Sequence, residues 1–133
     1  MTVLVGYVPS LLGEAALAAA VEQARFRDEP VLVVNTSRGD AYVDPRLAQE
    51  PDLNRVVREL TAAGVPHTVR QLIRGRDAAE EIVEIVEAED VSLVVIGIRH
   101  RTPVGKLIMG STAQEILLRV RCPVLAVKAP ETD

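Results

Sequence analysis

Five short apolar runs, rich in Val, Leu and Ile, alternate along the chain with longer segments in which apolar residues recur at helical spacing. Continuous runs of this kind are typical of strands that are covered on both faces of a parallel sheet. The expected strands are residues 3–5, 31–34, 67–73, 93–96 and 124–127, and Gly97 is expected to end the fourth. Strands that alternate with helices predict an α/β fold, here a doubly wound parallel five-stranded sheet in a flavodoxin- or Rossmann-like three-layer sandwich.

The third run is the least apolar of the five, because His67, Thr68, Arg70 and Gln71 interrupt it. Such a composition suits a strand at the edge of a sheet. The strand order 3-2-1-4-5 places this run at an edge, and it creates a switch point between strands 1 and 4. Folds of this class bind ligands at the carboxyl ends of the strands beside the switch point, so a binding crevice is expected there.

Capping residues mark three of the expected helix starts. Ser10 precedes the first helix and is suited to cap it. Asp77 and Glu80 have the spacing of a capping box at the third helix, and Thr112 and Glu115 have the same spacing at the fourth. On this interpretation the hydroxyl of Thr112 bonds its own helix.

The second helix follows a segment of a different character. Residues 35–49 combine polar and turn-forming side chains and are expected to form a long, mobile, solvated connection. The helix after it has a predicted buried stripe, made of Leu53, Val56, Val57, Leu60 and Ala63.

The composition limits the class of protein. The 133 residues suit one domain, expected over residues 1–129 with a short tail at 130–133, and 48% of them are apolar. The net charge of −4 and the aromatic content of 2% argue against a nucleic-acid partner. A single cysteine, Cys122, excludes an internal disulfide. No basic leader precedes the first apolar run and no run approaches a membrane span, so a cytoplasmic location without membrane association is expected.

Candidate chemistry is concentrated after the fourth strand. A basic loop there contains Arg99 and Lys106, and the sequence Gly110-Ser111-Thr112 then opens a helix. The free N–H groups and the dipole of a helix start favour negative charge, and the basic side chains can pair with phosphate. Catalytic patterns such as a nucleophile elbow or a His/Glu metal cluster are missing, so a binding role without catalysis is expected.

This stretch resembles the C-terminal half of a universal stress protein domain. Nucleotide-binding members of that family show Gly, two residues, Gly, nine residues, Gly, and then Ser or Thr. Gly97, Gly110 and Ser111 match this pattern, whereas His100 stands at the second glycine. Those members also carry Asp-Gly-Ser after the first strand, where this chain has Val8-Pro9-Ser10.

The resemblance implies a stress-response ligand-binding or signalling module that binds ATP or AMP. Adenine is expected against Val34 and Ile96, near Gly97, and the phosphates over Gly110, Ser111 and Thr112, with Arg99 or Lys106 adding charge. The missing Asp argues against bound magnesium. Two alternatives stay open, a nucleotide-free dimer that acts through protein contacts and a slow phosphohydrolase.

The last strand also predicts an assembly. It is apolar at every position from 124 to 127 although it forms an edge, and an exposed apolar edge invites association. Antiparallel pairing with a second copy across a two-fold axis would cover it. A homodimer is therefore expected, as the family resemblance also implies, through Pro123, Val124, Leu125, Ala126, Val127 and Lys128.

Overall fold

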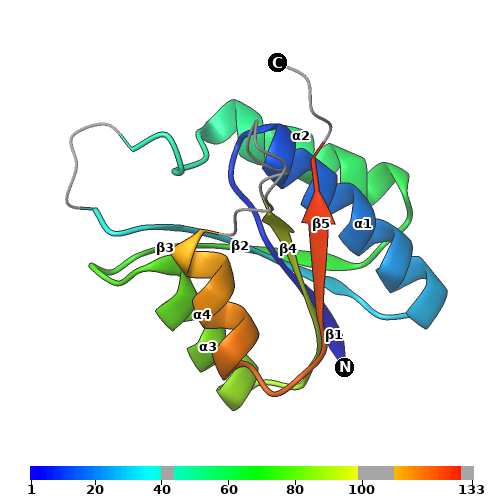
Figure 1. Ribbon diagram of the computed structural model, residues 1–133. Helices are drawn as coiled ribbons and strands as arrows, with labels where there is room; N and C mark the ends of the chain where they lie inside the picture. The colour runs from blue at the N-terminus through cyan, green and yellow to red at the C-terminus, as the bar shows by residue number, and fades with distance from the viewer. Residues whose placement is uncertain (40–43, 99–109, 130–133) are drawn as a thin grey trace, which may run out of the picture.

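The computed structural model describes residues 1–39, 44–98 and 110–129. Strands and helices alternate strictly along these residues (Figure 1). The elements are β1 (Thr2–Gly6), α1 (Leu11–Arg27), β2 (Val31–Ser37), α2 (Glu50–Ala62), β3 (His67–Ile73), α3 (Ala78–Ala88), β4 (Val91–Ile98), α4 (Ser111–Arg119) and β5 (Val124–Lys128). The α/β fold predicted from the apolar runs is confirmed. The expected tail, residues 130–133, lies outside the described part.

The five strands form one sheet in the order β3-β2-β1-β4-β5, and every neighbouring pair is parallel. The predicted order is therefore confirmed. β3 lies at an edge, and its residues are only half-buried or exposed, as its interrupted apolar pattern predicted. β1 pairs with β2 from Val3 opposite Val31 to Gly6 opposite Val34, so β1 ends three residues before β2 does.

Each face of the sheet is covered by two helices (Figure 1). α1 and α2 pack on one face, where the alanines of α1 let the helix approach the strands closely. α3 and α4 pack on the other face through Ala79, Ile82, Ala113 and Ile116. Strand residues alternate between the two cores, because successive side chains point to opposite faces.

Two strands are longer than the sequence predicts. β2 continues past Val34 through three polar residues to Ser37, and all three are buried. β4 continues through Gly97 to Ile98, so this glycine does not end the strand. The polar end of β2 is stable because distant partners satisfy most of its side-chain groups, which a local pattern does not reveal.

Helix starts and faces differ from the prediction in two places. The capping box at Asp77 and Glu80 is confirmed, with Glu80 N donating to Asp77 Oδ1 at 2.9 Å. The box expected at Thr112 is wrong, because Gly110 is the N-cap of α4 and no side chain caps this helix. Val57, expected in the buried stripe of α2, is 40% exposed, since Val56 and Leu60 alone turn fully to the sheet.

Candidate functional site

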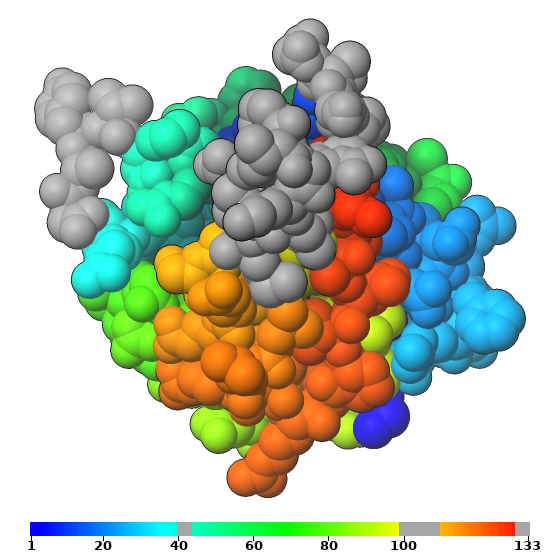
Figure 2. Space-filling model, in the orientation of Figure 1, coloured from blue at the N-terminus to red at the C-terminus, as the bar shows by residue number. Residues whose placement is uncertain are grey.

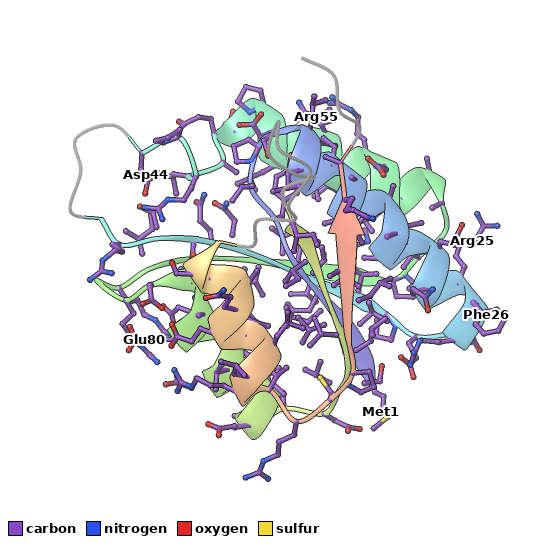
Figure 3. The ribbon with its side chains drawn as sticks, in the orientation of Figure 1. Met1, Arg25, Phe26, Asp44, Arg55 and Glu80 are labelled. Carbon is purple, nitrogen blue, oxygen red and sulfur yellow. The ribbon has the colours of Figure 1, made fainter. Side chains whose placement is uncertain are left out.

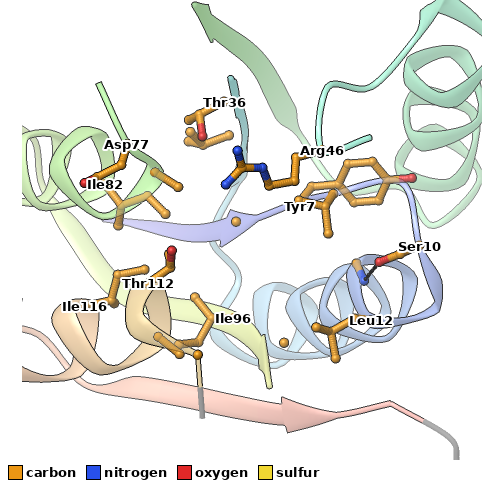
Figure 4. A pocket seen from close by; sticks show the side chains of 18 of the residues that line it. Tyr7, Ser10, Leu12, Thr36, Arg46, Asp77, Ile82, Ile96, Thr112 and Ile116 are labelled. Atoms are coloured by element: carbon orange, nitrogen blue, oxygen red, sulfur yellow. Dashed lines mark hydrogen bonds between the residues drawn. The ribbon is translucent and has the colours of Figure 1, made fainter. Parts of the chain in front are cut away.

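A cavity of about 490 Å³ opens at the carboxyl ends of the strands (Figure 4). This volume lies within the range of about 300–1,000 Å³ that small-molecule sites occupy. The ends of β1, β2 and β4 form its floor, as the switch-point rule predicts. Its walls are the starts of α1, α3 and α4 together with Pro45 and Arg46 from the connection before α2.

Two glycines shape the floor. Gly6 lies at the end of β1, and a Cβ there would approach Ile82 Cδ1 to 3.2 Å, so the missing side chain lets α3 pack closely on the sheet. A Cβ on Gly97 would lie 2.6 Å from Leu12 Cγ and 2.8 Å from the Leu12 carbonyl oxygen. Gly97 therefore allows the start of α1 to pack directly on β4, which closes one side of the cavity.

Three helix starts face the cavity, and two of them are capped by their own side chains. Ser10 Oγ accepts a hydrogen bond from Gly13 N at 3.2 Å at the start of α1, and Asp77 caps α3. Gly110 is the N-cap of α4, and the first hydrogen bond of this helix runs from Gln114 N to Gly110 O at 3.1 Å. The N–H groups of residues 111–113 thus have no acceptor in the described part of the chain. These donors and the helix dipole make the α4 start the point where the cavity attracts an anion.

Arginine side chains add positive charge to the walls. Arg46 Nε lies 3.3 Å from Asp44 Oδ1, and its terminal nitrogens bond no other described residue. Figure 4 shows this guanidinium extending into the middle of the cavity. Arg76, on the opposite wall, is paired with Glu84 at 2.8 Å and with Glu81 at 3.4 Å.

Glu81 is a buried charge that the sequence pattern did not reveal. Its side chain is fully buried on α3 and accepts hydrogen bonds from Arg74, one of them from Nε at 3.0 Å. The bonded guanidinium lowers the pKa of Glu81 below its ordinary value, despite burial, which acts in the opposite direction. This pair ties the end of β3 to α3 and thereby holds the wall that carries Arg76.

Asn35 holds the opposite wall in place. Its Nδ2 donates to Tyr7 O at 2.9 Å and to Arg46 O at 2.8 Å. Its Oδ1 accepts from Ala48 N at 2.9 Å and from Gln71 Nε2 at 3.0 Å. The connection expected to be mobile and solvated is therefore hydrogen-bonded to buried Asn35 at two of its residues, Arg46 and Ala48.

Tyr7 is part of the cavity lining and also of the core beneath α1 and α2. Its hydroxyl donates to Glu14, and Arg55 (labelled in Figure 3) bonds both groups, at 3.3 Å to the hydroxyl and 3.0 Å to the carboxylate. Burial and the neighbouring carboxylate raise the pKa of Tyr7 to about 12. The hydroxyl of Tyr7 therefore stays neutral at physiological pH.

The predicted site residues fall into three groups. Val34, Ile96, Gly97, Gly110 and Thr112 line the cavity. Ser111 is the first residue of α4 and contributes a free N–H group beside it. Arg99 and Lys106 lie outside the described residues.

Sequence reasoning missed several lining residues, among them Thr36, Arg46, Arg76 and Asp77. Thr36 lies at the end of β2, and the others follow β2 or β3, whereas the prediction drew mainly on the segments at β1 and β4. The polar run after residue 34 was the available signal, because polar residues at the end of a central strand face the crevice.

The described residues contain neither a metal-binding group nor a membrane-spanning helix. Within residues 1–39, 44–98 and 110–129, no group of three or more His, Cys, Asp or Glu side chains is arranged to hold a metal ion. Over the same residues, no helix has the length and apolar character needed to cross a membrane.

Comparison with known proteins shows similarity along almost the whole chain. A model of the universal stress protein family matches residues 1–128. A universal stress protein of Mycolicibacterium smegmatis is 47% identical over 126 residues, which cover 95% of this chain and 96% of the relative. A universal stress protein structure from Archaeoglobus fulgidus has a TM-score of 0.81 at 31% identity, covering 96% of this chain and 98% of that chain. A structure from the same organism, in complex with dAMP, has a TM-score of 0.70 at 25% identity, with the same coverage.

Proposed function

This chain belongs to the universal stress protein family, and from that premise we propose that it binds an adenine nucleotide, AMP or ATP, as a stress-response ligand-binding or signalling module. The observation that carries the proposal is the α4 start, which alone among the three helix starts at the cavity lacks a side-chain cap in the described residues. Its free N–H groups suit a phosphate. The related structure in complex with dAMP supports the same class of ligand.

The proposed pose places the phosphates at the start of α4 and the base over the sheet. Val34 and Ile96 are core residues whose apolar side chains form part of the cavity lining, and the base is proposed to lie against them. The guanidinium of Arg46 extends into the same space and adds charge that attracts phosphate. The cavity therefore offers an apolar end and an anion-binding end, as a nucleotide requires.

We propose binding without catalysis and without a required metal. Position 8 is Val, so the loop after β1 offers no carboxylate to hold magnesium. Asp77, a carboxylate in the cavity wall, already caps α3 through Glu80 N. Incubation with Mg-ATP and chromatography of the products tests this part, since release of ADP faster than with buffer alone would contradict it.

Two substitutions at Gly110 test the anion site. A Cβ at this position meets nothing within 4 Å, so both Gly110→Ala and Gly110→Asp fit without a clash. Asp is a strong N-cap that occupies the free N–H groups and repels phosphate. We expect Gly110→Asp to abolish AMP and ATP binding in calorimetry, while Gly110→Ala retains it.

Gly110→Asn separates the two causes, because it caps the helix without charge. Equal affinity of wild type and Gly110→Asp would contradict the proposed phosphate position. Absence of AMP and ATP binding by the wild-type protein would contradict the proposed function itself.

We also propose that the protein forms a homodimer through β5. Val124 and Ala126 pack toward α3 and α4, whereas Leu125 and Val127 pack toward α1, so both faces of β5 contribute to a core. All four are still only half-buried in the single chain, and Figure 2 shows β5 (red) reaching the surface between α4 (orange) and α1 (blue). This residual exposure at an open strand edge supports pairing with a second copy.

Sedimentation of a lysine variant tests the dimer. Leu125→Lys places a charge in the proposed interface and should shift a dimer toward monomer. Phe26→Ser is the matched control, because Phe26 is 87% exposed at the end of α1 and points away from β5 (Figure 3). A wild-type monomer at tens of micromolar would contradict the proposal.

A further inference from the structure

Thr36 is a buried polar residue without a partner in the described part of the chain. It is 9% exposed, and its hydroxyl makes no hydrogen bond to any other described residue. The two polar residues beside it on β2 are both satisfied, Asn35 by four hydrogen bonds and Ser37 by Asp44 Oδ2 at 2.7 Å. Buried hydroxyls are usually paired, so a hydroxyl that bonds no other described residue is available to a ligand.

The hydroxyl faces the cavity. Side chains alternate along a strand, so Thr36 shares the face of Leu32 and Val34, which pack toward α3 and α4. Figure 4 shows the Thr36 hydroxyl pointing into the cavity. The lining there includes the apolar side chains of Ile82 and Ile96, and Thr36 adds a neutral hydrogen-bonding group to them.

Its position relative to α4 decides which part of a ligand it would meet. β1 lies between β2 and β4 in the sheet. Neighbouring strands lie about 4.8 Å apart, so Thr36 lies roughly 10 Å across the sheet from the strand that leads to α4. A phosphate at the α4 start therefore leaves the ribose over β1 and the base over the end of β2.

We propose that Thr36 is a specificity-determining residue whose hydroxyl bonds the edge of the base that lies farthest from the ribose. This inference rests on the proposed function, because it takes a nucleotide as the ligand. In adenine that edge carries the N1 acceptor and the 6-amino donor, and a hydroxyl can either donate to the first or accept from the second. Apolar contacts with Val34 and Ile96 do not distinguish one base from another, whereas this hydrogen bond favours a base with a polar group at that edge.

A double-mutant cycle between the side chain and the base tests the inference. Thr36→Val removes the hydroxyl and keeps the shape, Thr36→Ser keeps a hydroxyl, and Thr68→Val is the control at an exposed position of β3. The ligands are AMP, 1-deaza-AMP, which lacks N1, and purine riboside 5′-monophosphate, which lacks the amino group. We expect Thr36→Val to bind AMP about 10-fold more weakly, the value of one hydrogen bond, and the serine variant to stay within about 3-fold of wild type. The valine penalty should vanish with one of the two analogues.

Thermal unfolding provides a second, independent readout. Because the hydroxyl bonds no other described residue and faces the cavity, Thr36→Val should not lower the unfolding midpoint of the free protein while it weakens AMP binding. A purely structural role for Thr36 predicts a lower midpoint.

Two results would overturn the inference while leaving the proposed function intact. One is equal AMP affinity of wild type and Thr36→Val, and the other is the same valine penalty with all three ligands. Failure of wild type to bind any of the three ligands would overturn the proposed function together with the inference.

Discussion

Replacement of Asn35 by alanine tests whether the cavity wall is held by one buried side chain. Asn35 is fully buried, and its amide joins the end of β1, the start of α2, β3 and the segment that carries Arg46. Alanine removes all four hydrogen bonds and leaves the buried N–H of Ala48 and the carbonyl of Tyr7 without these partners. The change therefore acts on the fold and on the site together.

The four bonds set the expected magnitude. Each hydrogen bond contributes about 1 kcal/mol net, and each buried group left unpaired costs about 1–3 kcal/mol, with the larger values when water cannot replace the partner. Because Arg46 O lies near the surface, water can replace that bond, and a total loss of about 4 kcal/mol is expected for Asn35→Ala. Domains of this kind have unfolding free energies of about 5–15 kcal/mol, so the variant should fold but lose a large share of its stability.

Urea unfolding followed by circular dichroism measures this loss. Asn54→Ala is the matched control, because Asn54 is exposed on α2. The unfolding free energy of this control should stay within about 0.5 kcal/mol of wild type. AMP affinity, measured where Asn35→Ala is fully folded, should also fall, since Arg46 loses its backbone anchor. A loss below about 1 kcal/mol with an unchanged m-value would show that the hydrogen-bonded amide is not what holds this wall.

Three further outcomes are expected. Glu81→Gln should destabilise the protein by about 1–3 kcal/mol at pH 7, because Arg74 loses a charged partner. The stability advantage of wild type is present above about pH 4.5 and should disappear as the pH falls through the lowered pKa of Glu81 in the folded state. Thermal melts of both proteins from pH 7 to 3 would show this loss. Gly97→Ala should cost about 1–3 kcal/mol and weaken AMP binding, because the added carbon meets the carbonyl oxygen of Leu12 at 2.8 Å. Ultraviolet titration should show a tyrosine with a pKa near 12 that is absent from Tyr7→Phe, and stability should fall between pH 10 and 12 because the folded state keeps the proton longer.

The sheet was predictable because its signals are local. Apolar β-branched runs mark strands, and the polar interruptions of residues 67–73 correctly assigned β3 to an edge. The end of β2 was not predictable in the same way. Asn35, Thr36 and Ser37 look like a loop in sequence, and what buries Asn35 is bonding to residues 28 and 36 positions away.

The burial of Glu81 on α3 was not predictable from composition. A glutamate has the character of a surface residue, and its ion pairs with Arg74 and Arg76, which lie just before α3, allow its burial. The start of α4 was ambiguous for a different reason, because Gly110 and Thr112 are both plausible local starts. In the structure Gly110 is the N-cap, and Thr112 lies inside the first turn of the helix.

Three residues that depart from the usual preferences for helix capping, buried hydroxyls and strand residues all line the cavity. The N-cap of α4 is a glycine although Asp or Ser would cap it better, Thr36 is buried without a described partner, and Gly6 is a glycine on a central strand. Each choice costs the free protein some stability, and all three line the same cavity. Ser10 and Asp77, by contrast, cap the neighbouring helices as the rules predict. Sequences that are locally consistent break these rules mainly where function requires it. The shared position of the three exceptions is therefore an argument for a ligand in this cavity that does not depend on family membership.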